Sequence, residues 1–123
     1  MMDFMASKEN GSPQVWLGDL NVGPTVPQSS IVGEYESNYE TIEDDGWVEA
    51  NTFSDEPFCT FCPHENETGL WKGDENLAID HIWVRNANVS NTKRILDETY
   101  TIAGITLHPS DHFGVQATVS KLD

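Results

Sequence analysis

The chain has 123 residues, of which 37% are hydrophobic, including four Trp, five Phe and three Tyr. This length fits a single domain, and the aromatic content is typical of a chain that folds. The 21 acidic and 6 basic residues give a formal net charge of -15, which excludes a protein held on nucleic acid by positive charge alone. Bound cations can invert the local field, so the charge favours metal-dependent phosphate chemistry; for most of these residues the alternative role is solubility.

No apolar run approaches the length of a membrane span, so we expect no transmembrane segment, and residues 1–11 lack the features of a signal peptide. Three Asn-x-Ser/Thr sequons, at Asn10, Asn66 and Asn88, matter only if the intact protein enters a secretory route. The sequence therefore leaves the compartment open, with secretion of a full-length form as one alternative.

The chain starts with a predicted helix end and a strand. Apolar residues at helical spacing in residues 2–9, followed by Asn10-Gly11, predict the last turns of a helix within residues 1–12. Residues 14–17 form a nearly continuous apolar run, as in a strand buried on both faces, and this run ends in the turn residues Gly18-Asp19. A helix leading directly into a buried strand suggests that another part of the fold precedes it.

A second helix is predicted after a loop. Residues 25–30 are rich in Pro and Ser, and apolar residues then recur at helical spacing from Ile31 to Ile42. We expect one amphipathic helix there, ending at Asp45-Gly46.

The rest of the chain predicts a long loop followed by three strands. Residues 51–73 are rich in turn residues and include a short apolar segment at 58–61 that fits an edge strand. Residues 78–85 alternate as a strand, residues 92–102 fit an extended segment, and residues 113–119 alternate again.

Asp19 and Asn21 stand two residues apart directly after the first strand, so both side chains project to the same side if the backbone stays extended. Ligands of α/β folds bind at the carboxyl ends of strands. A carboxylate there can hold a cation or position water, and an Asn can donate a hydrogen bond to a phosphoryl oxygen. Alone, an Asp-x-Asn turn is more often only a strand-ending cap.

Asp111 and His112 lie at a second boundary between loop and strand, where His112 can take a proton from water and Asp111 can bind a hard cation. As an isolated pair they fit a plain surface pair better. Asp80 is the more informative residue, because a carboxylate inside an apolar strand is costly to bury without a partner. An imidazolium is the natural partner, so we expect Asp80 to orient His112; a solvated strand face is the alternative for Asp80.

Three motifs follow one another in the order Val15-Trp16-Leu17-Gly18-Asp19-Leu20-Asn21, Ile79-Asp80-His81-Ile82 and Pro109-Ser110-Asp111-His112-Phe113-Gly114-Val115. In order and spacing they resemble the second half of the endonuclease/exonuclease/phosphatase superfamily, which has the DNase I-like fold. The resemblance covers nearly all of residues 13–123. It implies the carboxy-terminal half of an α/β sandwich, with a mostly antiparallel sheet and one or two helices, and hence a partial domain over residues 1–123.

The resemblance also implies roles for five residues. Asp19 and Asn21 would stabilise the attacking water and the phosphoryl transition state, Asp111 would be the metal-proximal carboxylate, and His112 would be the general base oriented by Asp80. The implied reaction is hydrolysis of a phosphate ester, assisted by Mg²⁺ or a similar divalent cation. Two further segments, 59–70 and 93–97, resemble the neutral sphingomyelinase-type branch more than the DNA-repair branch. A phospholipid headgroup is therefore a candidate substrate, and nucleic acid is less favoured.

The family's amino-terminal half carries an Asn and a Glu metal ligand and another active-site His, and this chain has no counterpart to that half. A lone half would expose the surface of its sheet, so we expect it to be inactive by itself and to offer that face for self-association. The rival hypothesis is a non-catalytic binding module that retains half of the fold.

Cys59-x-x-Cys62, with His64 nearby, is open to three interpretations: a local disulfide, two free thiols or a structural zinc site. Zinc is the least favoured of the three because the chain lacks a second cysteine pair.

Overall fold

The computed structural model describes residues 11–123, so the helix end predicted within residues 1–12 lies almost entirely outside the described residues. The elements in chain order are β1 (Gln14–Asp19), the 3-10 helix η1 (Pro27–Ser29), α2 (Glu36–Asp44), β2 (Val48–Glu49), β3 (Asp80–Arg85), β4 (Ala87–Ile95), β5 (Tyr100–Ile102), β6 (Ile105–Leu107) and β7 (Gly114–Lys121). Mixed α and β structure is confirmed: the described strands pair antiparallel, and α2 is the one α-helix among these residues.

The first sheet has the order β1-β3-β2, with β3 in the middle. Strands β1 and β3 pair antiparallel over their whole length, from Gln14 opposite Arg85 to Asp19 opposite Asp80. Trp16 lies opposite Trp83, and Trp83 is fully buried. The predicted strands at 14–17 and 78–85 are therefore confirmed as β1 and β3, and their pairing brings the ends of two sequence motifs together. The expectation that the first strand is buried on both faces is wrong, because Val15 and Leu17 are 45% and 67% exposed on one side of β1.

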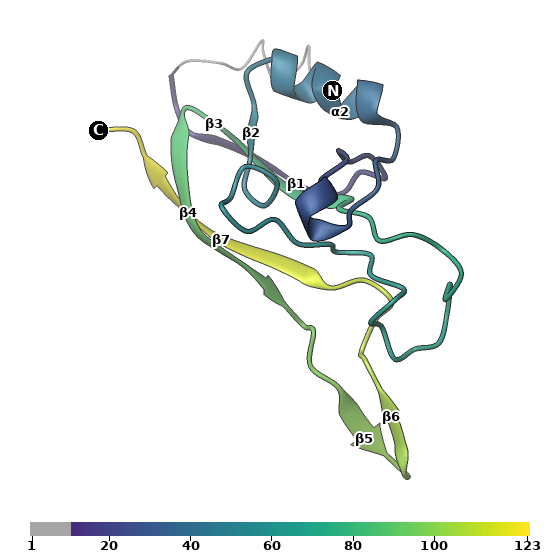
Figure 1. The fold of residues 1–123 in the computed structure, drawn as a ribbon. Helices are drawn as coiled ribbons and strands as arrows, with labels where there is room; N and C mark the ends of the chain where they lie inside the picture. Colours follow the sequence, from purple (N-terminus) through teal and green to yellow (C-terminus); the bar gives the residue numbers. More distant parts are fainter. Residues whose placement is uncertain (1–10) are drawn as a thin grey trace.

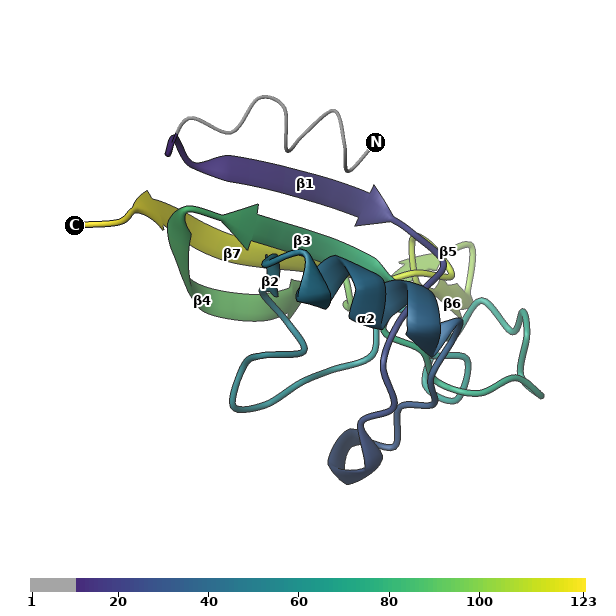
Figure 2. The same ribbon diagram turned by 90° about the horizontal axis from the view of Figure 1, so that it is seen from above.

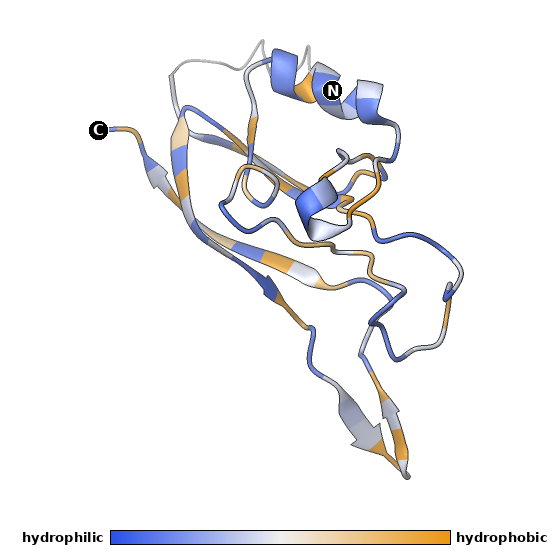
Figure 3. Ribbon diagram, viewed as in Figure 1, coloured by the Kyte–Doolittle hydropathy of each residue, from blue (hydrophilic) through white to orange (hydrophobic). Residues whose placement is uncertain are grey.

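The second sheet is a long ribbon of β4 and β7, which pair antiparallel with a register shift between Ser90 and Lys93. This ribbon leads away from the first sheet toward the hairpin β5–β6, which projects from the far end of the molecule (Figure 1). Ile102 and Ile105 at the hairpin tip are 76% and 61% exposed, and the tip is coloured as hydrophobic (Figure 3).

Two predicted segments have different bounds in the structure. The extended segment expected at 92–102 is divided between β4 and β5, because Leu96 takes a positive φ of 58° that interrupts the strand. The edge strand expected at 58–61 is reduced to isolated bridges, in which Phe61 pairs with Leu77 and with His112. The final predicted strand, 113–119, is confirmed as β7.

The second helix is shorter than predicted. Helix α2 begins only at Glu36, because the backbone of Tyr35 has a left-handed φ of 45°. The Tyr35 side chain is 67% exposed, so it is not part of the buried face of the helix. Ile31 instead exchanges two backbone hydrogen bonds with Val26 across η1. Its helical spacing to Ile42 was thus coincidental, since a tight turn places Ile31 in a different part of the core. The predicted end at Asp45-Gly46 is confirmed, with Gly46 at a φ of 86°.

The buried apolar residues form two clusters. One joins α2 to the first sheet through Tyr39, Ile42, Trp47 and Trp83. Figure 2 shows α2 running beside β3 and β2, as this packing requires. The other cluster includes residues of the long loop between β2 and β3. Its members are Val26, Ile31, Cys59, Cys62, Ala78 and Phe113. The loop between β2 and β3 therefore has a core of its own, although it has little regular secondary structure. Within residues 11–123, no helix is long and apolar enough to cross a membrane.

Candidate active site

Asp19 ends β1 directly opposite Asp80, which begins β3. The Asp19 Oδ1 atom accepts a hydrogen bond of 2.9 Å from the backbone N–H of Asn21, and Asn21 takes a left-handed φ of 51°. Asn and Asp are the side chains that most readily form and tolerate such a turn. The motif thus makes a strand-ending turn and holds the Asp19 carboxylate beside β3. The backbone does not stay extended to Asn21, so the condition for the predicted common side of Asp19 and Asn21 is not met, and the role of Asn21 stays a prediction.

The expected contact between Asp80 and His112 is confirmed. The His112 Nδ1 atom lies 2.7 Å from Asp80 Oδ2, and the two side chains are 27% and 22% exposed. Donation from Nδ1 to the carboxylate selects the tautomer with a lone pair on Nε2. The ring can therefore accept a proton at Nε2 while Asp80 stabilises the imidazolium.

Asp19, Asp80 and His112 each offer a ligand atom, and these three atoms lie within 4.8 Å of one another. Two carboxylates from adjacent strands suit Mg²⁺, which takes oxygen ligands and keeps several of its waters. The donor set therefore fits a hard divalent cation, held by Asp19 and Asp80, better than it fits a soft metal.

Asp111, the residue expected beside the metal, is not part of this group. Its Oδ2 atom accepts a hydrogen bond of 3.3 Å from the indole of Trp71, so its carboxylate is engaged with the long loop. Ser110 shapes the same tail, because its hydroxyl accepts a 3.1 Å hydrogen bond from the His112 backbone N–H. A cation-binding role of Asp111 stays a prediction.

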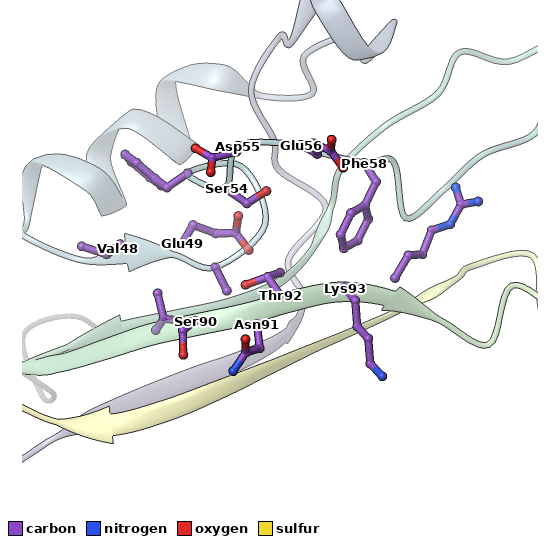
Figure 4. A pocket seen from close by; sticks show the side chains of 14 residues that line it. Val48, Glu49, Ser54, Asp55, Glu56, Phe58, Ser90, Asn91, Thr92 and Lys93 are labelled. Atoms are coloured by element: carbon purple, nitrogen blue, oxygen red, sulfur yellow. The ribbon is translucent and has the colours of Figure 1, made fainter.

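A small hollow of about 230 Å³ opens beside two of the three clustered side chains, Asp19 and Asp80, and is also lined by Leu17 and by Phe113, the neighbour of His112. A larger hollow of about 840 Å³ lies elsewhere, between the segment from β2 to Phe58 and strand β4 (Figure 4). Its walls contain neither Asp19 nor Asp80, whereas both carboxylates line the smaller hollow, so we place the candidate chemistry there.

Sequence reasoning missed a buried pair behind the site. The side chains of His81 and Glu49 are fully buried, with His81 Nδ1 3.3 Å from Glu49 Oε1. Nε2 of His81 lies 2.6 Å from the Val22 carbonyl, which it meets as a donor. His81 on β3 therefore contacts both Glu49 on β2 and the carbonyl of Val22, which lies in the turn after Asp19. The only local signal was the histidine next to Asp80, and nothing in the sequence marked Glu49 as its partner.

Burial by itself would raise the pKa of the Glu49 carboxyl, but the His81 imidazole and the hydrogen bonds from Thr52 outweigh burial and lower this pKa. The carboxylate also accepts hydrogen bonds from the backbone N–H groups of Asn51 and Thr52, at 3.0 and 2.6 Å. Glu49 is thus a fully partnered buried anion, which makes it a structural rather than a reacting group.

Cys59 and Cys62 form a disulfide, which decides between the three interpretations of this motif. Both sulfurs and a Glu65 oxygen lie close together, but disulfide sulfurs are not thiolate ligands. The Arg94 guanidinium also lies 3.8 and 3.7 Å from the two sulfurs, where its charge opposes a cation. The zinc interpretation is therefore wrong for this state of the protein.

Two of the three sequons can be placed. Asn66 is 4% exposed, and its amide donates a 2.9 Å hydrogen bond to the Ser110 carbonyl, whereas Asn88 is exposed on β4. Asn10 lies outside the described residues. Of the two placed sequons, only Asn88 is open to a glycan in the folded chain.

Comparisons of the chain with protein-family models, with curated proteins and with solved structures found no match.

Proposed function

We propose that this chain forms the water-activating side of a divalent-cation-dependent phosphodiester hydrolase, built as the carboxy-terminal half of a DNase I-like sandwich. The observation that carries the proposal is the 2.7 Å contact between His112 and Asp80, with Asp19 in reach of both. The antiparallel first sheet, with α2 packed against it, is compatible with this fold.

In the proposed reaction His112 accepts a proton at Nε2 from the attacking water, while Asp80 holds the ring and stabilises its positive charge. Asn21 donates a hydrogen bond to a phosphoryl oxygen as negative charge develops there. A divalent cation at Asp19 and Asp80 would neutralise the phosphate and offset the repulsion between the two carboxylates. A phosphodiester, with a phospholipid headgroup as one candidate, is the proposed substrate class.

The test is hydrolysis of bis(p-nitrophenyl) phosphate by the full-length gene product in the presence of MgCl₂. We expect activity that EDTA removes and that falls by roughly 10²- to 10⁴-fold in His112→Ala, the usual contribution of a general base. A matched control is His64→Ala, because His64 is exposed and lies outside the group formed by Asp19, Asp80 and His112. Unchanged activity in His112→Ala would overturn the assignment.

A second candidate is a non-catalytic binding module that associates through the exposed face of β1. The observation in its favour is that Val15 and Leu17 on this strand are 45% and 67% exposed. Large apolar side chains side by side on a sheet favour association. A full-length product without any phosphodiesterase activity, together with an oligomer that disperses in Leu17→Glu, would favour this candidate over the hydrolase.

A further inference from the structure

The two residues of the candidate catalytic pair come from segments that are not paired with each other in a sheet. Asp80 begins β3, and His112 lies in the tail before β7, 32 residues further along the chain. A 2.7 Å contact between partly exposed side chains needs both backbones to be held in place. The segment 59–62 contacts both of them.

Thr60 is fully buried and bonds to both sides of the pair. Its hydroxyl oxygen accepts hydrogen bonds from the backbone N–H groups of Ile79, at 3.2 Å, and Asp80, at 3.1 Å. Its carbonyl accepts a 2.7 Å hydrogen bond from the backbone N–H of Phe113. A hydroxyl has two acceptor lone pairs, so one side chain satisfies both donors at the start of β3. Thr60 thus bonds directly to Asp80 and to the neighbour of His112.

Phe61 adds a second link on the same side. Its backbone forms bridges to Leu77 and to His112, with hydrogen bonds of 3.0 and 2.8 Å exchanged with Leu77. Its ring lies 5.3 Å from the His112 imidazole, measured between centroids. The ring of His112 is therefore packed against the residue that follows Thr60.

The two ends of segment 59–62 are also held in place. The disulfide between Cys59 and Cys62 closes it, and both cysteines are buried. Arg94 on β4 lies against the two sulfurs, with its guanidinium 4.6 Å from the centre of the Phe113 ring. Two hydrogen bonds to Glu65, at 2.9 and 3.0 Å, hold Arg94 there.

We propose that Thr60 is a positioning residue that holds Asp80 and His112 in contact, and that the disulfide between Cys59 and Cys62 keeps Thr60 in place. This inference rests on the proposed function, since it concerns the pair that would activate water. It differs from a general packing role, because Thr60 bonds to the backbones that carry the two reacting side chains. Thr60 itself touches no reacting atom.

The test uses the His112 Nδ1 proton in NMR spectra of the chain. This signal is assigned by its loss in Asp80→Asn, and its exchange rate with water reports how tightly the pair is held. Thr60→Val keeps the shape of the side chain but removes the acceptor of two backbone N–H groups, so we expect exchange to be faster by about tenfold or more. Thr60→Ser restores an acceptor and is expected to restore slow exchange.

Thr41→Val is the matched control, because the Thr41 hydroxyl also makes a backbone hydrogen bond, but to Ser37 within α2. It should leave the His112 proton unchanged. Equal exchange rates in the original chain and in Thr60→Val would overturn the positioning role alone. If the His112 proton is unaffected by Asp80→Asn, the pair itself is absent and the proposed function falls too.

A measurement on the unaltered chain covers the case in which Thr60→Val does not fold. The backbone amides of Ile79 and Asp80 should exchange as slowly as the paired amides of β3, because Thr60 accepts from both. Rapid exchange of these two amides would overturn the proposal without any substitution.

Discussion

Asp19 and Asp80 stand directly opposite each other in the antiparallel register of β1 and β3, so two carboxylates of like charge occupy one cross-strand position. Such a pair is destabilising unless a proton, an imidazolium or a cation lies between them. His112 partners Asp80 and leaves the Asp19 carboxylate bonded to the Asn21 backbone alone among the described residues. The Asp19 and Asp80 carboxylates therefore repel each other, and a cation bound between them would reduce this repulsion.

We therefore predict that Asp19→Asn stabilises the chain in the absence of divalent cations, by about 0.2 to 1 kcal/mol, the usual range of cross-strand pairs. Asparagine keeps the acceptor for the Asn21 N–H but removes the charge. Urea unfolding in EDTA measures the change. Asp19→Asn should also abolish any rise in Tm that MgCl₂ gives the original chain. A rise of the same size in both proteins would show that the cation binds elsewhere.

Asp80→Asn should reduce phosphodiesterase activity of the full-length product strongly, because the amide can hold the His112 ring in the wrong tautomer. We expect a loss of roughly 10²- to 10⁴-fold in kcat. The rate of bis(p-nitrophenyl) phosphate hydrolysis at saturating substrate measures it. Asp74→Asn serves as the control, since Asp74 is exposed and lies outside the candidate site. A change in KM with kcat intact would contradict an orienting role for Asp80.

The buried Glu49 gives a prediction for acid stability. Its pKa is lowered in the folded state, so the ionised carboxylate contributes stability above its ordinary pKa of 4.5, and this contribution is lost as pH falls through the lower folded value. Glu49→Gln removes the buried negative charge that accepts the Asn51 and Thr52 hydrogen bonds and should lower the free energy of unfolding at pH 7 by about 1 to 3 kcal/mol.

The difference between Glu49→Gln and the original chain should shrink below pH 4.5, where the unfolded carboxyl takes up its proton. Urea unfolding at a series of pH values measures this. Glu40→Gln on the exposed side of α2 is the control and should change stability little. A difference that stays constant with pH would contradict the role given to the carboxylate charge.

Removing the disulfide should lower the free energy of unfolding by about 2 kcal/mol, as expected when a very short loop is released in the unfolded state. The double variant Cys59→Ser with Cys62→Ser, compared by urea unfolding, measures this. Dithiothreitol should shift the original chain toward the variant and leave the variant unchanged. No difference between oxidised and reduced chain would mean that these cysteines are not bonded in solution.

The exposed face of β1 predicts self-association of the isolated chain. Sedimentation velocity at micromolar concentration should show an oligomer, and Leu17→Glu should shift it toward monomer, since Leu17 is 67% exposed on that face. Leu122→Glu is the matched control, because Leu122 is 55% exposed near the carboxyl terminus. A monomer throughout would contradict the prediction.

The strands that carry the candidate site could be predicted from the sequence because their patterns are local. The apolar run before Gly18-Asp19, and the alternation around Asp80, depend on which neighbouring residues face the core. The contact between Asp80 and His112 was also predictable, since a carboxylate in an apolar strand needs a partner. Each of these inferences used a constraint that a single residue or a short run imposes by itself.

What the sequence determined by itself is thus the presence of the candidate catalytic residues and the strands that hold two of them. Only the tertiary structure decided that Ile31 lies outside the helix and that Glu49 contacts His81. It also decided that Thr60 accepts hydrogen bonds from the backbones of Asp80 and Phe113. The physical reason is distance along the chain: these contacts join segments whose local patterns carry no information about each other. Burial and hydrogen-bond satisfaction select the partners only once the chain has folded.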